Sequence, residues 1–194
     1  LARWADNDWP LIVRRSEYNL LPNTIGLGLA LPPDPHTGVK MRIPLSVNLD
    51  DIARHELPLE LAAAKSALPS AWQAAYSELS DDVCSRQLEF RVYGSLALQA
   101  ITGLPYLTAT SDIDVLFYPR THAQLQQGLL LLRAHAQHLS LDGEIVFPSG
   151  RAVAWKEWVE ATEHTNNVRV LVKSMSVLNL ADIAGLLFEL EELS

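Results

Sequence analysis

Apolar and polar residues alternate with a period of two in short segments of the first half of the chain. Between Ile25 and Leu31, large aliphatic residues alternate with glycine and alanine. This pattern predicts a strand with one buried face. A second strand is expected over Val39–Val47, after the turn-forming run 32–38, and a shorter one over Leu11–Val13. The chain is therefore expected to begin with a small β-rich unit.

Helix signals follow these strands. Asp50 or Asp51 is expected to cap a helix over Ile52–Glu56, and Pro58 occupies a position typical of a helix start. Pro and Ser at positions 69 and 70 then precede an alanine-rich segment, Ala71–Leu79, which is predicted to be helical.

The second half of the chain alternates apolar strands with helical segments. The predicted strands are Glu89–Tyr93, Ile113–Tyr118, Asp142–Phe147, Arg151–Trp155 and Val168–Lys173, and the predicted helices are Ser95–Thr102, Thr121–Leu139 and Leu178–Leu190. Polar residues cluster in Ser80–Arg86, where we expect the joint between a β-rich and helical domain (1–80) and a catalytic domain (81–194). The predicted fold class is α+β, with a mixed sheet packed by helices in the second domain.

Composition and charge restrict the function. The chain is 48% apolar and 20% charged, as expected of a globular protein with a hydrophobic core. A formal net charge of −8 argues against a long nucleic acid as partner, because such a partner requires a basic face. Cys84 is the single cysteine, so no internal disulfide can form, and a reducing, cytoplasmic compartment is expected. No apolar run is long enough to predict a membrane partner.

A glycine-serine pair, Gly94-Ser95, lies between a predicted strand and a predicted helix. A strand that enters a helix through glycine leaves backbone N–H groups pointing outward, and the missing Cβ allows a phosphate to approach. The Ser95 hydroxyl adds a donor. The alternative is a simple tight turn in which Ser95 only caps the helix.

Two carboxylates, Asp112 and Asp114, stand at the start of the next predicted strand. Residues i and i+2 of a strand face the same side, so these carboxylates repel each other unless a cation lies between them. A hard ion such as Mg²⁺ relieves the repulsion and commonly brings phosphate oxygens with it. The alternative is an exposed polar strand end. The glycine-serine turn nearby favours the metal site.

A third carboxylate is expected nearby, and the candidates are Asp142 and Glu144, again two residues apart on a predicted strand. Glu144 lies deeper in the apolar run and is slightly favoured as a metal ligand, since Asp142 stands where the strand begins. Both are retained as candidate catalytic residues.

The glycine-serine turn and the aspartate pair resemble the signature of the polymerase-β-type nucleotidyltransferase superfamily. The wider chain resembles the phosphoribosyl-dephospho-CoA transferases, which are the holo-acyl-carrier-protein synthases of malonate decarboxylase. The segments that carry this resemblance are Trp9–Arg15, Arg91–Ala100, Thr102–Thr108, Ser111–Asp114, Asp142–Pro148, Gly150–Trp155 and Val170–Lys173. Two departures from the superfamily pattern are a single glycine where Gly-Gly-Ser is common and a longer gap before the aspartates. Neither removes a metal ligand.

The resemblance implies a reaction and a site. The donor would be 2′-(5″-triphosphoribosyl)-3′-dephospho-CoA, the acceptor a serine of the acyl carrier subunit of malonate decarboxylase, and the released product pyrophosphate. Asp112 and Asp114 match the metal-binding pair of the family, with Mg²⁺ or Mn²⁺ as the ion and no organic cofactor beyond the donor. Gly94 and Ser95 would bind donor phosphates. The cations expected to balance the remaining phosphate charge are Arg91, Arg151 and Lys173.

Two other functions are compatible with the same residues. The chain could be a different nucleotidyltransferase that adenylylates a protein or a small molecule, which the identity of the donor would distinguish. It could also be a non-catalytic ligand-binding subunit that keeps the fold. Retention of both Asp112 and Asp114 argues against that reading.

Overall fold

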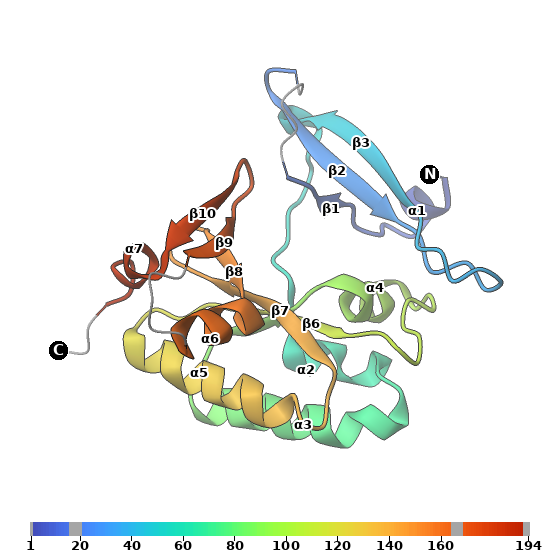
Figure 1. The fold of residues 1–194 in the computed structure, drawn as a ribbon. Helices are drawn as coiled ribbons and strands as arrows, with labels where there is room; N and C mark the ends of the chain where they lie inside the picture. The colour runs from blue at the N-terminus through green and yellow to red at the C-terminus, as the bar shows by residue number, and fades with distance from the viewer. Residues whose placement is uncertain (1, 16–20, 164–168, 192–194) are drawn as a thin grey trace.

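The computed structural model describes residues 2–15, 21–163 and 169–191. The described residues form two β-sheets, a three-stranded sheet at the N-terminus and a seven-stranded sheet packed with helices (Figure 1). The predicted α+β fold class is confirmed. No helix among the described residues is long and apolar enough to cross a bilayer.

The three-stranded sheet has the order β1-β2-β3 and is antiparallel throughout. Its strands are β1 (Ile12–Val13), β2 (Thr24–Ala30) and β3 (Arg42–Asn48), and a short helix, α1 (Ala2–Asp6), precedes them. The strand predicted over Ile25–Leu31 is confirmed as β2. Burial does not alternate along it, however, because residues 26–29 are all buried, Leu27 and Leu29 among them, whereas Ile25 is half-buried. The predicted turn at 32–38 lies in the long connection between β2 and β3.

The helix expected over Ile52–Glu56 is absent from the structure. A 3-10 turn, η1 (Leu49–Asp51), is followed by an extended segment over 52–58. The Asp50 side chain accepts a hydrogen bond from Asn23 instead of capping a helix. This carboxylate therefore fastens the end of β3 to the start of β2, and the chain leaves the small sheet without a helix.

The seven-stranded sheet has the order β10-β9-β8-β7-β6-β5-β4, in which β6 and β7 are parallel and all other neighbours are antiparallel. Its strands are β4 (Leu59–Glu60), β5 (Phe90–Val92), β6 (Ile113–Phe117), β7 (Leu141–Val146), β8 (Ala152–Ala154), β9 (Arg169–Lys173) and β10 (Leu178–Asp182). Its helices are α2 (Leu61–Ala64), the 3-10 turn η2 (Lys65–Ala67), α3 (Ser70–Ser85), α4 (Gly94–Thr102), α5 (His122–His135), α6 (Trp155–Glu163) and α7 (Ile183–Leu187).

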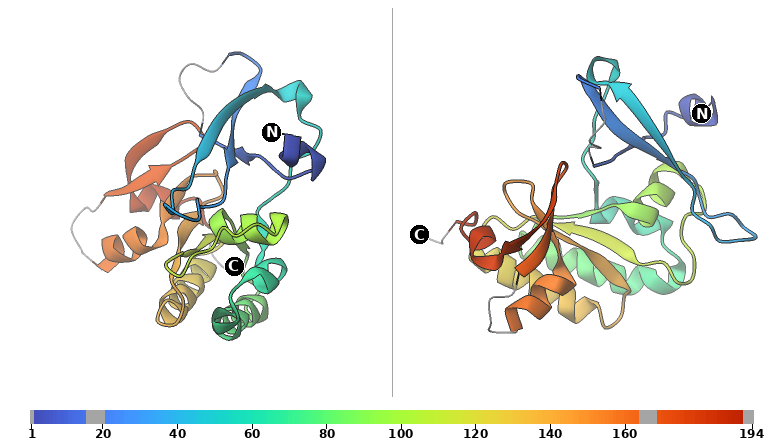
Figure 2. Two further views of the ribbon diagram at one scale, coloured as in Figure 1. Left: turned by 90° about the vertical axis from the view of Figure 1, so that its right-hand side faces the viewer. Right: turned by 45° about the horizontal axis from the view of Figure 1, so that its top comes forward.

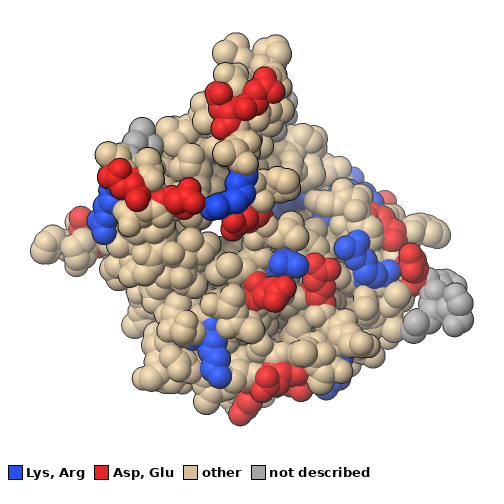
Figure 3. All heavy atoms as spheres, turned by 180° about the vertical axis from the view of Figure 1, so that it is seen from behind, with Lys and Arg blue, Asp and Glu red and all other residues tan. Residues whose placement is uncertain are grey.

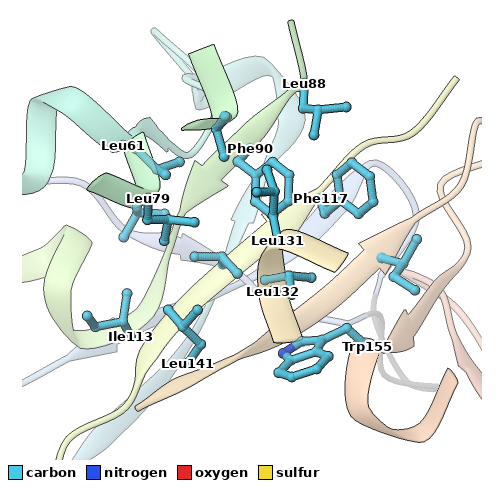
Figure 4. Packing of buried hydrophobic residues seen from close by; sticks show 14 of the residues in the cluster. Leu61, Leu79, Leu88, Phe90, Ile113, Phe117, Leu131, Leu132, Leu141 and Trp155 are labelled. Atoms are coloured by element: carbon cyan, nitrogen blue, oxygen red, sulfur yellow. The ribbon is translucent and has the colours of Figure 1, made fainter. Parts of the chain in front are cut away.

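Helices α3, α5 and α6 cover one face of the large sheet, and the three-stranded sheet stands on the other side (Figures 1 and 2). Alternate residues of β6 point into the helical core, where the rings of Phe117 and Phe90 stack with centroids 4.5 Å apart (Figure 4). Ile113 and Val115 are also fully buried there. The remaining residues of β6, including Asp114, therefore face away from the helices.

The segment Ser80–Arg86, where the joint between domains was expected, is mostly helical in the structure. Helix α3 continues to Ser85, because Leu79 and Val83 carry its apolar side into the core beyond the predicted helix end. Strand β4 and helices α2 and α3 thus belong to the large sheet and its helical layer, although they lie before the predicted joint. The chain passes between the two sheets in the extended segment 52–58.

The prediction of a helix over Leu178–Leu190 is wrong for the first five residues. Residues 178–182 form β10, which pairs antiparallel with β9, and only Ile183–Leu187 are helical. Cross-strand pairing explains the difference, because Leu180 lies opposite Leu171 in this ladder. Helix α5 ends at His135 rather than Leu139, and Val168 of the predicted β9 segment lies outside the described residues.

The close approach of α5 to β6 gives a test of this packing. A Cβ added at Gly128 of α5 would lie 2.2 Å from the ring of Phe117, which is itself buried. We expect Gly128→Ala to lower the free energy of unfolding by about 1–2 kcal/mol, because overpacking outweighs the gain in helix propensity.

The matched control is Gly185→Ala in α7, where an added Cβ meets nothing within 4 Å. This variant should unfold like the unchanged chain or be up to about 1 kcal/mol more stable. Urea unfolding measures both. Equal stability of the two variants would contradict the packing of α5 on β6.

Candidate functional site

The carboxylates identified in the sequence lie on the face of the large sheet that α3, α5 and α6 do not cover. Strands β6 and β7 run parallel, and their register places Asp114 beside Asp142 and Leu116 beside Glu144. Asp112 immediately precedes β6, two residues from Asp114, with the buried Ile113 between them. Its Oδ1 accepts a hydrogen bond from Ser140 Oγ at 2.5 Å. The two aspartates thus occupy the same side of the strand.

Asp114 is the most perturbed of these acids. Burial of its carboxylate raises the pKa to about 6, and the neighbouring charges of Asp142 and Asp112 act in the same direction. Lys40 and Arg42 of the N-terminal unit oppose the shift, and lower the pKa. The carboxylate is therefore held where its own negative charge is disfavoured unless a cation stands close to it.

Gly94 sets the position of that carboxylate. Its φ of +67° lies in the left-handed region, and a Cβ built on it would fall 2.1 Å from Asp114 Oδ2. The backbone N–H of Tyr93 donates to the carbonyl of Asp114 at 3.1 Å. The sequence suggested that the missing Cβ admits a phosphate. In the structure, the space beside Gly94 is taken by the Asp114 carboxylate, so glycine is required for the contact between the start of α4 and β6.

Ser95 is not the cap of α4. The N-cap position is occupied by Tyr93, whose side chain makes no capping hydrogen bond. The Ser95 hydroxyl accepts a hydrogen bond from Lys40 Nζ at 3.0 Å. The first turn of α4 therefore begins with backbone N–H groups that the N-cap side chain does not satisfy, beside a lysine from the other sheet.

Asp142 is better placed than Glu144 to act with Asp114. Glu144 Oε1 lies 2.6 Å from Lys173 Nζ, and its backbone pairs with Leu116, one step further along β6. Asp142 pairs directly with Asp114, and its Oδ1 is 3.4 Å from Lys156 Nζ. Among the described residues, no three acidic, histidine or cysteine side chains are already arranged as a metal site.

The donor atoms nevertheless suit a hard divalent ion. The groups that converge here are carboxylate oxygens, with Asp112 and Asp114 on one side of β6 and Asp142 on the neighbouring strand. Mg²⁺ and Mn²⁺ prefer such oxygen ligands, and Mg²⁺ usually keeps only one or two protein carboxylates, with water and phosphate completing its shell. Two aspartates are therefore sufficient protein ligands for either ion.

Both arginines that were predicted to bind phosphate form ion pairs with glutamates instead. Arg151 pairs with Glu189 and donates to the carbonyl of Gly185, which fastens the β7–β8 hairpin to the end of α7. Arg91 pairs with Glu89 at 3.3 Å and donates to the carbonyl of Pro58. Both therefore have structural partners, whereas Lys173 lies on the carboxylate face beside Glu144.

Sequence reasoning gave no role to Lys40, Arg42 or Tyr93. The phenol of Tyr93 is surrounded by acids: burial raises its pKa, and the charges of Glu144, Asp114 and Asp142 raise it further. Tyr93 thus remains a protonated hydrogen-bond donor among carboxylates. Lys40 and Arg42 stand two residues apart, just before and at the start of β3, which is a local signal of a basic patch, but the sequence does not indicate which site this patch meets.

Comparison with known proteins places the chain among transferase enzymes. Residues 1–58 match the model of the phosphoribosyl-dephospho-CoA transferase MdcG N-terminal domain, and residues 59–184 match that of the MdcG C-terminal domain. The chain therefore belongs to the phosphoribosyl-dephospho-CoA transferase family. The boundary between the two models lies where the chain crosses from one sheet to the other.

Curated relatives carry the same name. A phosphoribosyl-dephospho-CoA transferase of Bradyrhizobium diazoefficiens is 36% identical over 94% of this chain and 77% of its own length. One of Xanthomonas campestris pv. campestris is 37% identical over 81% of this chain and 74% of its own length. One of Xanthomonas euvesicatoria pv. vesicatoria is 35% identical over 96% of this chain and 84% of its own length. No solved structure matches the chain significantly.

The raised pKa of Asp114 predicts a pH-dependent cost to stability. Its pKa is about 6 in the folded chain and has an ordinary value of 3.8. The ionised carboxylate therefore destabilises the fold above pH 6, and the cost disappears as the pH falls towards 4. Asp114→Asn should raise the free energy of unfolding by about 1–2 kcal/mol at pH 8, a value reduced from ~3 because the carboxylate is partly exposed to solvent.

Urea unfolding at pH 8 and at pH 5 measures this effect, and the gain should be smaller at the lower pH. Asp81→Asn, at an exposed position of α3, is the matched control and should change stability little at either pH. If the Asp114→Asn variant were less stable than the unchanged chain at pH 8, this would contradict the crowding of the three aspartates.

Proposed function

We propose that this chain transfers the phosphoribosyl-dephospho-CoA group from 2′-(5″-triphosphoribosyl)-3′-dephospho-CoA to a serine of the acyl carrier subunit of malonate decarboxylase. Membership of the transferase family supports the donor. The single structural observation that carries the proposal is the position of Asp112 and Asp114 on one side of β6, against the start of α4. This arrangement provides cation ligands and an anion-binding helix terminus side by side.

The reaction forms a phosphodiester. The oxygen of the acceptor serine attacks the phosphorus nearest the ribose, the bond from that phosphorus to the bridging oxygen breaks, and pyrophosphate leaves with its electron pair. A divalent cation, Mg²⁺ or Mn²⁺, supplies charge neutralisation and lowers the pKa of the attacking hydroxyl when it is bound. Asp112 and Asp114 are the residues that would hold it.

The other groups of the site bind and orient the donor. The backbone N–H groups at Gly94 and Ser95 point from the first turn of α4 and favour a phosphate oxygen. The phenol of Tyr93 stays protonated and can donate a hydrogen bond among the carboxylates. Asp114, with a pKa of about 6, is mostly ionised near pH 7.5 and is therefore in the form that can hold a cation.

Asp112→Asn and Asp114→Asn are each expected to lower the rate of transfer at least about a hundred-fold, because several kcal/mol of charge stabilisation depend on the carboxylates. Mass spectrometry of the carrier subunit after incubation with enzyme, donor and Mg²⁺ measures the attached group directly, and a pyrophosphate assay follows the leaving group.

Asp81→Asn is the control and should transfer at the normal rate. Transfer by either site variant at a near-normal rate would contradict the assignment. Incubation with ATP in place of the dephospho-CoA derivative tests the alternative that the chain is an adenylylating nucleotidyltransferase. A mass increase of the carrier by an adenylyl group would support that alternative. Binding of the donor with no transfer to any carrier would indicate a ligand-binding subunit.

A further inference from the structure

The connection between β2 and β3 extends from the N-terminal sheet to the helix α4. We call residues 31–41 the arm. In Figure 1 and in the right-hand view of Figure 2, the arm runs down beside α4 and the loop that follows it. Two side-chain contacts hold the two ends of the arm there. The Tyr106 hydroxyl donates to the carbonyl of Ala30, the last residue of β2, at 2.7 Å, and Lys40 Nζ donates to Ser95 Oγ at 3.0 Å. The small sheet therefore contacts the catalytic elements directly.

The end of the arm brings two cations to the carboxylate site. Lys40 reaches the first turn of α4 through Ser95, and Arg42 lies opposite Ala30 in the β2–β3 ladder, next to the Tyr106 contact. Ser95 directly follows Gly94, and the Cβ position of Gly94 lies 2.1 Å from Asp114 Oδ2, so the contact of Lys40 with Ser95 brings its charge close to the Asp114 carboxylate. Lys40, Arg42 and the first turn of α4 thus surround a region beside the aspartates.

The charges of these two residues are not neutralised by ion pairs within the described part of the chain. Many other cations are paired there: Lys173 with Glu144, Lys156 with Asp142 and Arg151 with Glu189. On the face shown in Figure 3, several Lys and Arg side chains lie beside Asp or Glu. Lys40 instead donates to a neutral hydroxyl, and a phosphate oxygen is a stronger acceptor for an ammonium group than a hydroxyl is.

We propose that Lys40 and Arg42 bind the two terminal phosphates of the donor, which leave as pyrophosphate, between the arm and the first turn of α4. This inference rests on the proposed function. The reacting phosphorus must lie at Asp112 and Asp114, so the remaining phosphates extend towards α4, where Lys40 already contacts Ser95. Three aspartates repel a triphosphate, and the two cations from the other sheet compensate for that repulsion.

Isothermal titration of the full chain with inorganic pyrophosphate, in the presence of Mg²⁺, tests the site without the transfer reaction. Lys40→Ala and Arg42→Ala should each weaken pyrophosphate binding roughly tenfold or more, as expected for the loss of a charge-assisted hydrogen bond. Lys40→Arg keeps the charge and should retain most of the affinity. Arg54→Ala is the control, because Arg54 lies on the segment between the sheets and pairs with Asp8 and Glu56.

Steady-state kinetics separate binding from a structural effect. Both alanine variants should raise the KM for the donor while the KM for the carrier subunit stays unchanged, and their urea unfolding curves should match that of the unchanged chain. Unchanged pyrophosphate affinity and unchanged donor KM would overturn the inference while leaving the proposed transfer intact. Weakened pyrophosphate binding in a chain that modifies no carrier would support the anion site and reject the proposed function.

Discussion

The site depends on the contact between the Asp114 carboxylate and Gly94. Glycine allows the start of α4 to approach β6 so closely that Asp114 Oδ2 lies 2.1 Å from where a Cβ would stand. The parallel pairing of β6 and β7 then places Asp142 beside it, and Asp112 lies two residues earlier on the same side. Three negative charges are therefore held together by backbone geometry. Burial raises the pKa of Asp114 to about 6, and the charges of Asp142 and Asp112 add to this shift.

The two sheets bring charges of opposite sign to the candidate site. The large sheet supplies carboxylates and a helix terminus, but Arg91 and Arg151, the arginines expected at the site, are bound to Glu89 and Glu189. The positive charge next to Asp114 comes from Lys40 and Arg42 of the small sheet. The candidate cation ligands and these two cations therefore lie next to each other where the two sheets meet, an arrangement that suits the proposed transfer of a phosphate-bearing group.

Much of the site could be predicted from local sequence, because its signals act over a few residues. The period of two places Asp112 and Asp114 on one side of β6, and the glycine-serine pair marks the start of α4. The choice between Asp142 and Glu144 as the partner of Asp114 could not be made in this way, since it depends on the register of β6 and β7, which are joined through α5. Lys40 could not be assigned for a similar reason, because the docking of two sheets leaves no local pattern.

Errors in the predicted fold have related causes. Leu180, Ile183 and Leu187 are spaced like one face of a helix, so the sequence favoured a helix where pairing with β9 produces β10. The polar residues of 80–86 suggested a joint, but Leu79 and Val83 keep that stretch of α3 in the core. In both cases tertiary contacts decided between structures that local patterns allow.

The most direct test of the central claim is the titration of the Asp114 carboxyl carbon by NMR, with and without Mg²⁺. A carboxylate that is buried, crowded by two other acids and used as a cation ligand should titrate near pH 6 in the metal-free chain, and its pKa should fall by at least about one unit when Mg²⁺ is bound. A pKa near the ordinary aspartate value without metal, or one that Mg²⁺ does not change, would contradict the account.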